Sequence, residues 1–459
     1  MEIEFKIAEG EFVVVSPFRV IGKEGKTNEF QLLDSEKHCW MELSLDNSRF
    51  SLESIDNRIN EPDDIIRDKL DSLVIKVIEA EQEGTDLTEL PTIQEERPFN
   101  PDEIKVNAKQ FSLRLITEMI DSEDMDLSPD FQRNFVWNNF QKSRLIESIL
   151  LRIPLPMFYF SEDEEGRISV VDGLQRITTI KEFMDNKFPL RNLEYLSDSC
   201  DGRYYQDEDK KKGLDPKYVR WFNQTQFSVN VIDPTSPSKV KYDIFRRINT
   251  GGKPLNNQEI RNCLSGKALR STLKQMTELE EFKSATDHSI KSTRMEDHEV
   301  ALRFVLFHRM IEKYGSIEQY NGYMDPSLDD LTDELQFSKE SELSKYVDLF
   351  SNSMKNAEYL LGARYAFRKI TPDDLEPYAY KQLINKALFA SLSVLLSEFD
   401  HEEIKNQNSQ NSLQMPLAEL IEDDGEFWNF LSYGTNGRSN LLYSFGKVQE
   451  LINQHLNFQ

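Results

Sequence analysis

The chain has 459 residues, of which 38% are hydrophobic and 30% are charged, and its formal net charge is −26. This length predicts two or three domains, because a single core rarely grows beyond about 250 to 300 residues. The composition excludes a disorder-dominated chain, and the negative charge argues against a protein that coats nucleic acid through bulk charge.

The N-terminal residues MEIEFKIAEG lack a basic stretch followed by an apolar one, and the longest apolar run, 387–396, is too short to span a bilayer. We therefore expect a cytoplasmic protein that makes no contact with a membrane. The three cysteines are scattered, which predicts neither a disulfide framework nor a zinc site.

The first 95 residues predict a small β-rich domain with a trailing helix, whose binding function the sequence does not indicate. Short β-like runs alternate with turn residues, and a helical pattern follows at 63–84. Residues 1–100 hold 24 acidic and 11 basic side chains, so their net charge of −13 is half of the total. Residues 85–103 are polar, contain three prolines and are typical of a linker.

The next stretch, up to about residue 265, mixes helical and strand patterns. Asn138 is a suitable cap for a helix that ends before Pro154 and whose apolar face holds Leu145, Ile146, Ile149 and Leu150. Two strands, 157–160 and 167–173, are joined by an acidic turn. From about 257 onward the patterns are mostly helical, as at 298–315, 380–399 and 445–458.

The run VVDGLQRITTI, 170–180, suggests phosphate chemistry. A strand that ends at Val171 would deliver Asp172 to its carboxyl end, and Gly173 would let the backbone approach a ligand. A helix that begins near Ile177 would offer unpaired N–H groups to an anion, and Arg176 would add a planar cationic fork. A plain β-turn before a capped helix is the simpler alternative, although it leaves the neighbouring amide and guanidinium unexplained.

Two further elements hold residue types of the same kind. FQRNFVW, 131–137, places Gln132 and Arg133 among aromatic side chains, with a surface arginine stacked on Trp137 as the alternative. FRRINTGGKPLNNQEI, 245–260, has two adjacent glycines that permit a loop of closely packed amides with a cationic rim. It belongs to a strip, 237–270, with 8 Lys or Arg against 2 acids, which indicates either a phosphate or nucleic-acid contact or a solvated helix face.

The order of these elements, FQRNFVW, RIPLP, VDGLQRITTI and RINTGGKPL, resembles a known family over residues 107–265. It is similar to the ParB/sulfiredoxin-like domain of the GmrS half of GmrSD type IV restriction enzymes and of SspE-type phage-defence proteins. The signature of that domain is usually D-G-Q-Q-R, and Leu174 stands where the first glutamine is common. The helical tail, through MEDHEVALRF, matches more loosely.

Together with the β-rich pattern of residues 1–95, which lie outside it, the resemblance implies an α+β fold of three domains: a β-rich domain at 1–95, a ParB/sulfiredoxin-like nucleotide-binding domain at 96–265 and a helical domain at 266–459. It also implies a nucleoside triphosphatase of bacterial defence that uses Mg²⁺. Asp172, Gln175 and Arg176 are the predicted catalytic residues, with Asp172 also the metal ligand. The predicted nucleotide-binding residues are Gln132, Arg133, Gly173, Thr178, Thr179, Asn249, Gly251, Gly252 and Lys253.

Members of this family often carry a C-terminal HNH nuclease, but none of the six histidines begins an H-x-x-P element. If the system cuts DNA, a nuclease partner protein is therefore expected to do so. Two other functions stay open: a nucleotide-gated or DNA-binding switch with little turnover, and a ParB-like protein that is itself a nuclease.

Overall fold

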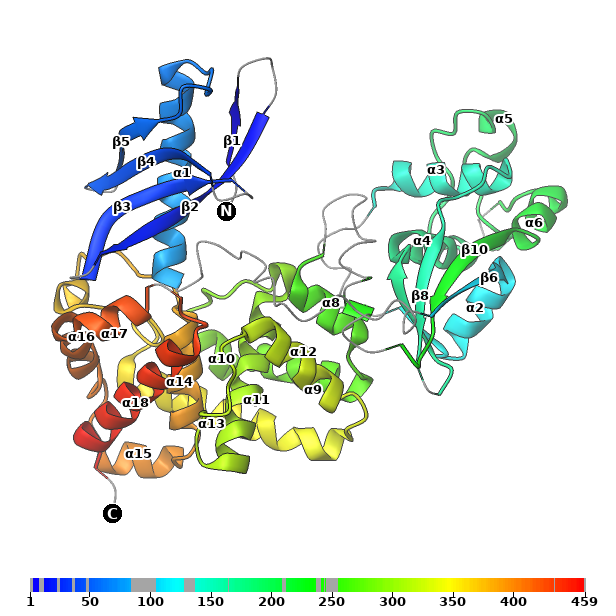
Figure 1. Cartoon of the computed structure of the whole chain (residues 1–459). Coiled ribbons are helices and arrows are strands. Elements are labelled where there is room, and N and C mark those ends of the chain that lie inside the picture. Colours follow the sequence, from blue (N-terminus) through cyan, green and yellow to red (C-terminus); the bar gives the residue numbers. More distant parts are fainter. Residues whose placement is uncertain are drawn as a thin grey trace. The chain divides into compact units, whose positions relative to one another are not determined.

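A computed structural model shows a mixed α+β protein, as predicted (Figure 1). It describes residues 3–7, 12–22, 25–34, 38–46, 49–83, 105–127, 137–163, 165–208, 212–236, 241–242, 244, 255–432 and 434–457. The predicted linker at 85–103 lies outside these ranges. The chain divides into one compact unit of residues 97–266 with 293–295, and another that holds 1–96, 267–292 and 296–459.

The N-terminal part is an antiparallel sheet with its strands in chain order and a helix against one face. Residues 12–22 form one continuous strand that includes Pro17, which lies opposite Leu32 of the neighbouring strand. Buried residues of the sheet, such as Phe30 and Leu43, share a core with Leu70 and Leu73 of the helix. The elements are β1 (Ile3–Lys6), β2 (Phe12–Gly22), β3 (Gly25–Leu33), β4 (Cys39–Asp46), β5 (Arg49–Ile55) and α1 (Asp63–Glu83).

The central unit is built on a second five-stranded sheet, ordered β6-β10-β8-β9-β7. The β10–β8 and β9–β7 pairs are parallel, and the β6–β10 and β8–β9 pairs are antiparallel. The predicted hairpin at 157–173 is confirmed as β8 and β9. The strands are β6 (Val106–Ser112), β7 (Met125–Asp126), β8 (Phe158–Glu162), β9 (Ile168–Asp172) and β10 (Gln226–Ile232).

Successive side chains of a strand point to opposite faces of a sheet, and here alternate residues of β8 and β9 are buried in two different clusters. Both faces of the sheet are therefore covered. Val170 of β9 and Phe160 of β8 belong to the larger core, whereas Val171 and Tyr159 belong to a smaller cluster with Ile260. The helices of this unit are α2 (Leu113–Asp121), α3 (Asn139–Leu150), α4 (Leu174–Met184), α5 (Ser197–Cys200), α6 (Pro216–Asn223) and α8 (Asn257–Leu264).

Helix α3 confirms its sequence pattern. Asn138 is the N-cap and forms a capping box with Gln141, which satisfies N–H groups at the helix start. The predicted apolar face is buried, with Ile146 fully inaccessible to solvent. The cap and the apolar periodicity are both local signals, which explains why the sequence predicts the start and the buried face of this helix correctly.

The C-terminal part is helical, as predicted, and its core is centred on α14, where residues 387–396 are all buried. Within the described ranges, no helix is long and apolar enough to cross a membrane. The elements are α9 (Lys267–Glu278), α10 (Glu280–Ala285), α11 (Glu296–Tyr314), α12 (Met324–Glu334), α13 (Glu340–Leu361), η5 (Pro372–Leu375), α14 (Lys386–Leu396), α15 (His401–Gln407), α16 (Gln414–Asp423), α17 (Gly425–Phe430) and α18 (Arg438–His455), while η4 (Thr293–Met295) belongs to the central unit.

Candidate functional site

The turn from β9 into α4 is tighter than the sequence suggests. β9 ends at Asp172, Gly173 is the N-cap, and α4 begins at Leu174 rather than near Ile177. Gly173 has φ 103°, a left-handed conformation that lets the chain pass directly from strand to helix. Because of this single glycine, the helix needs no connecting turn.

Gly173 is also required by close packing within the protein. A Cβ atom at this position would lie 2.3 Å from Cδ1 of Phe158 and 3.1 Å from Nη2 of Arg176. Phe158 is buried in the core of the central unit. The close approach that the sequence assigned to a ligand is therefore, in this structure, an approach to Phe158.

Arg176 ties the start of α4 to the segment that precedes β8. Its Nη2 lies 2.9 Å from Oδ2 of Asp172 and donates at 3.3 Å to the Met157 carbonyl, while Nη1 donates to the Pro156 carbonyl. The guanidinium carbon lies 4.2 Å from the centroid of the Phe158 ring. Burial lowers the pKa of Arg176, and the Asp172 carboxylate opposes that effect.

Asp172 is the more accessible partner, since 37% of its side chain is exposed, compared with 12% for Arg176. Gln175 is half-buried, and its side chain makes no hydrogen bond to a described residue. Thr178 is half-buried, whereas Thr179 is almost fully buried at 1% exposure. A ligand can therefore reach Asp172 and Gln175 without rearrangement of the helix, but it cannot reach the Thr179 hydroxyl.

The first turn of α4 contains backbone N–H groups that have no acceptor among the described residues. The N–H of Ile177 donates to the Gly173 carbonyl at 2.9 Å, and no side chain of a described residue caps the helix. The backbone N–H groups of Leu174, Gln175 and Arg176 donate to no acceptor in the described part of the chain. They form the positive end of a helix dipole, next to the Asp172 carboxylate.

The other predicted site residues fall on segments that the structure does not describe. Gln132 and Arg133 lie between Leu127 and Trp137, and Asn249, Gly251, Gly252 and Lys253 lie between Ile244 and Leu255. The predicted cleft that they share with Asp172 therefore stays a prediction.

The described ends of these segments do lie near β9. Ile244 and Leu255 both pack against the cluster that contains Val171, the neighbour of Asp172. β7, which precedes the other segment, runs parallel to β9, with Asp126 opposite Ser169. The described residues that flank these segments therefore lie beside the strand that carries the candidate acid.

Sequence reasoning missed the partners of Arg176. Pro156 and Met157 accept hydrogen bonds from Arg176, and the Phe158 ring lies against its guanidinium, but no contact with Arg176 was predicted for any of the three. The signal available in the sequence was the motif RIPLP, 152–156, which is one of the elements that carry the family resemblance.

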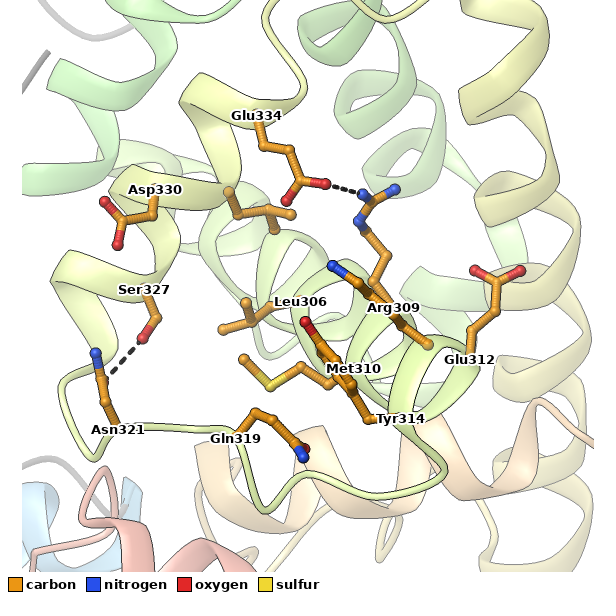
Figure 2. A pocket seen from close by; sticks show the side chains of 12 residues that line it. Leu306, Arg309, Met310, Glu312, Tyr314, Gln319, Asn321, Ser327, Asp330 and Glu334 are labelled. Carbon is orange, nitrogen blue, oxygen red and sulfur yellow. Dashed lines mark hydrogen bonds and ion pairs between the residues drawn. The ribbon is translucent and has the colours of Figure 1, made fainter.

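A separate hollow of about 460 Å³ lies between α11 and α12 (Figure 2). Leu306 and Met310 lie in its interior, and the Arg309–Glu334 ion pair spans its rim. Its lining holds three acids, Glu312, Asp330 and Glu334, against two cations, Arg309 and Lys313, so the hollow offers an anion little net attraction. Across the described ranges, no three His, Cys, Asp or Glu side chains gather as a metal site would require.

The part of the chain that resembles a known family includes this site. No curated protein matches the chain. Residues 116–265, which include β9, α4 and both undescribed segments, match the family described as GmrSD restriction endonuclease, N-terminal domain.

Proposed function

We propose that the central unit binds and hydrolyses a nucleoside triphosphate as a module of a bacterial anti-phage or restriction system. The observation that carries this proposal is the uncapped start of α4 beside the exposed Asp172 carboxylate. Its place within the stretch that resembles a restriction-enzyme domain supports it.

In this proposal the phosphates contact the N–H groups of the first turn of α4. The guanidinium of Arg176 has N–H groups that are not used by the Pro156 and Met157 carbonyls or by Asp172, and these N–H groups contact the phosphates. Arg176 also holds Asp172 in place. Gln175 orients the attacking water, and Asp172 accepts a hydrogen bond from that water. Thr178 contributes from the next turn, whereas Thr179 has a role only if the helix start rearranges.

The acid is also suited to Mg²⁺. Oδ2 of Asp172 faces Arg176, which leaves Oδ1 for a hydrated cation. Mg²⁺ commonly takes one or two protein carboxylates and completes its shell with water and phosphate oxygens, and it would neutralise charge on those oxygens. Gln132 and Arg133 on one side and Asn249, Gly251, Gly252 and Lys253 on the other would complete the anion site.

The test is a phosphate-release assay on the full chain with each of the four ribonucleoside triphosphates, Mg²⁺, and DNA present or absent. We expect release of phosphate from at least one of them. A protein that neither binds nor hydrolyses any of the four would overturn the proposal.

A second function, a nucleotide-gated switch with little turnover, is favoured by one contact. The Asp172 carboxylate is paired with Arg176 at 2.9 Å, and this contact occupies Oδ2, one of the two oxygens that could position a water or a metal ion. Tight nucleotide binding without phosphate release, together with a nucleotide-dependent change in DNA affinity, would select the switch.

A further inference from the structure

Helix α6 and the end of α3 form a surface that differs in charge from the rest of the chain. Residues 97–266 hold 25 Lys or Arg and 26 Asp or Glu, a net charge of −1 out of −26 for the whole chain. α6 itself, PKYVRWFN, contains two cations and no acid. A polyanion that avoids the acidic parts of the chain could therefore approach the central unit here.

The spacing in α6 separates a core face from a solvent face. Tyr218 and Phe222 are buried in the core. Lys217, Arg220 and Trp221 are exposed, and their spacing of three and four residues places them on one face of the helix. The solvent face of α6 is thus cationic and aromatic.

Arg152 extends this face from the neighbouring element. Its guanidinium carbon lies 4.5 Å from the centroid of the Trp221 ring, so the two side chains are stacked. Arg152 directly follows the C-cap of α3, and α3 contacts α6 (Figure 1). A stacked arginine and tryptophan present flat surfaces of the kind on which nucleic-acid bases stack.

Within the described ranges, no acid engages these cations. Arg152, Lys217 and Arg220 form no ion pair with any described residue. Elsewhere in the same unit, Lys142 pairs with Glu182 at 2.6 Å and Lys109 with Glu162 at 2.9 Å. Unpaired cations around an exposed indole are a poor arrangement for stability alone, and they fit a ligand that carries both phosphates and unstacked rings.

We propose that Arg152, Lys217, Arg220 and Trp221, here called the α6 surface, bind single-stranded DNA. The cations contact phosphates, and the Arg152–Trp221 stack receives an unpaired base. This binding does not depend on nucleotide hydrolysis, so its success or failure is separate from that of the proposed function.

The surface is also connected to the candidate site. Residues 152–157 run from Arg152, which stacks on Trp221, to Pro156 and Met157, whose carbonyls accept from Arg176. DNA bound at one end of this short segment therefore contacts the same stretch of chain that positions the guanidinium at the other end.

The test measures binding of the full chain, without nucleotide, to a labelled thymidine oligonucleotide of about 20 nucleotides, longer than the roughly 4–16 that one such site covers. The same strand in a duplex is the comparison. We expect single strands to bind more tightly, and Lys217→Gln with Arg220→Gln to reduce the log–log salt slope by roughly 1.4, about 0.7 for each lost phosphate contact. Arg167→Gln with Lys187→Gln is the matched control, since both residues are exposed but paired with acids.

Stacking is tested separately from charge. Trp221→Leu should weaken single-strand binding about tenfold, whereas Trp221→Phe, which keeps an aromatic ring, should retain most of the affinity. Circular dichroism melting establishes that both variants fold. No binding to single strands, a Trp221→Leu variant that folds and binds normally, or a preference for the duplex would overturn the proposal.

Discussion

Asp172 and Arg176 are bound to each other at the start of α4, with Oδ2 of the acid 2.9 Å from Nη2 of the arginine. The pair is asymmetric, because the acid is partly exposed while the arginine is largely buried and also bonded to two carbonyls. The same contact therefore holds one residue in the fold and leaves the other accessible for chemistry, and substitutions of the two should have different effects.

Asp172→Asn should abolish turnover and leave the protein folded. An amide oxygen can still accept from Arg176, but the charge that orients water or holds Mg²⁺ is gone. Triphosphate affinity should hold or rise, because carboxylate–phosphate repulsion disappears. Phosphate release and nucleotide titration measure the two effects. A folded variant that hydrolyses normally would make the acid a bystander, and one that fails to fold would make it structural.

Arg176→Ala should weaken nucleotide affinity about 10- to 100-fold, because it removes a charge-assisted contact that contributes roughly 1.5–3 kcal/mol. It should also lower the free energy of unfolding by about 2–4 kcal/mol, because the carbonyl partners at Pro156 and Met157 lose their donor and a buried volume is vacated. Urea denaturation measures the second effect. Arg167→Ala, at a residue 63% exposed, is the control and should change neither quantity. Unchanged stability in Arg176→Ala would contradict the role of this guanidinium as a tie between α4 and β8.

Gly173→Ala should destabilise the protein by more than about 1 kcal/mol, since a positive φ and a close contact act together. The new Cβ would meet the Phe158 ring at 2.3 Å. Gly166→Ala is a matched control: its φ is +82°, and no atom of the described residues lies within 4 Å of the position that a Cβ atom would take there. The difference between the two variants in thermal unfolding isolates the cost of the contact with Phe158, and equal losses would show that backbone conformation alone accounts for it.

The buried carboxylate of Glu147 should make stability depend on acid pH. Burial raises its pKa, but N–H groups of Leu196, Glu194 and Tyr195 and the Arg144 guanidinium bind the charged form, and the net result is a lowered pKa. A lowered pKa in the folded state stabilises the protein above the unfolded value, about 4.3, and this contribution is lost as the pH falls toward the folded value.

Glu147→Gln should therefore flatten the fall in stability below about pH 4.3 and cost roughly 2–4 kcal/mol at neutral pH, because an amide offers one acceptor oxygen where the carboxylate offers two. Oε1 accepts from Tyr195 at 2.7 Å and Leu196 at 3.0 Å, and Oε2 from Glu194 at 3.1 Å. Urea denaturation at several pH values, with the exposed Glu118→Gln as control, measures both effects. An unchanged pH profile would contradict the assignment.

The sequence predicted those features whose contacting residues lie close together along the chain, and it missed those whose partners are far apart. The capped helix α3 and the β8–β9 hairpin depend on signals within a few residues, and both were predicted. The pairing of β6 with β10 was not, since Gln110 and Ser228 are 118 residues apart and no local pattern joins them. For the same reason Arg176 was recognised as a functional candidate, whereas its carbonyl partners some twenty residues earlier were not.

The long-range pairing of β6 has a consequence during synthesis. At roughly 5–20 residues per second, β6 leaves the ribosome about 6 to 24 seconds before its partner β10. An unpaired strand is a template for aggregation during that wait, and lysines are a common protection. β6 reads VNAKQFS, its first five residues are exposed even in the finished fold, and Lys109 lies in the middle of the strand. The polarity of β6 makes the strand hard to recognise in the sequence. The same polarity should limit aggregation of the nascent chain before β10 is synthesised.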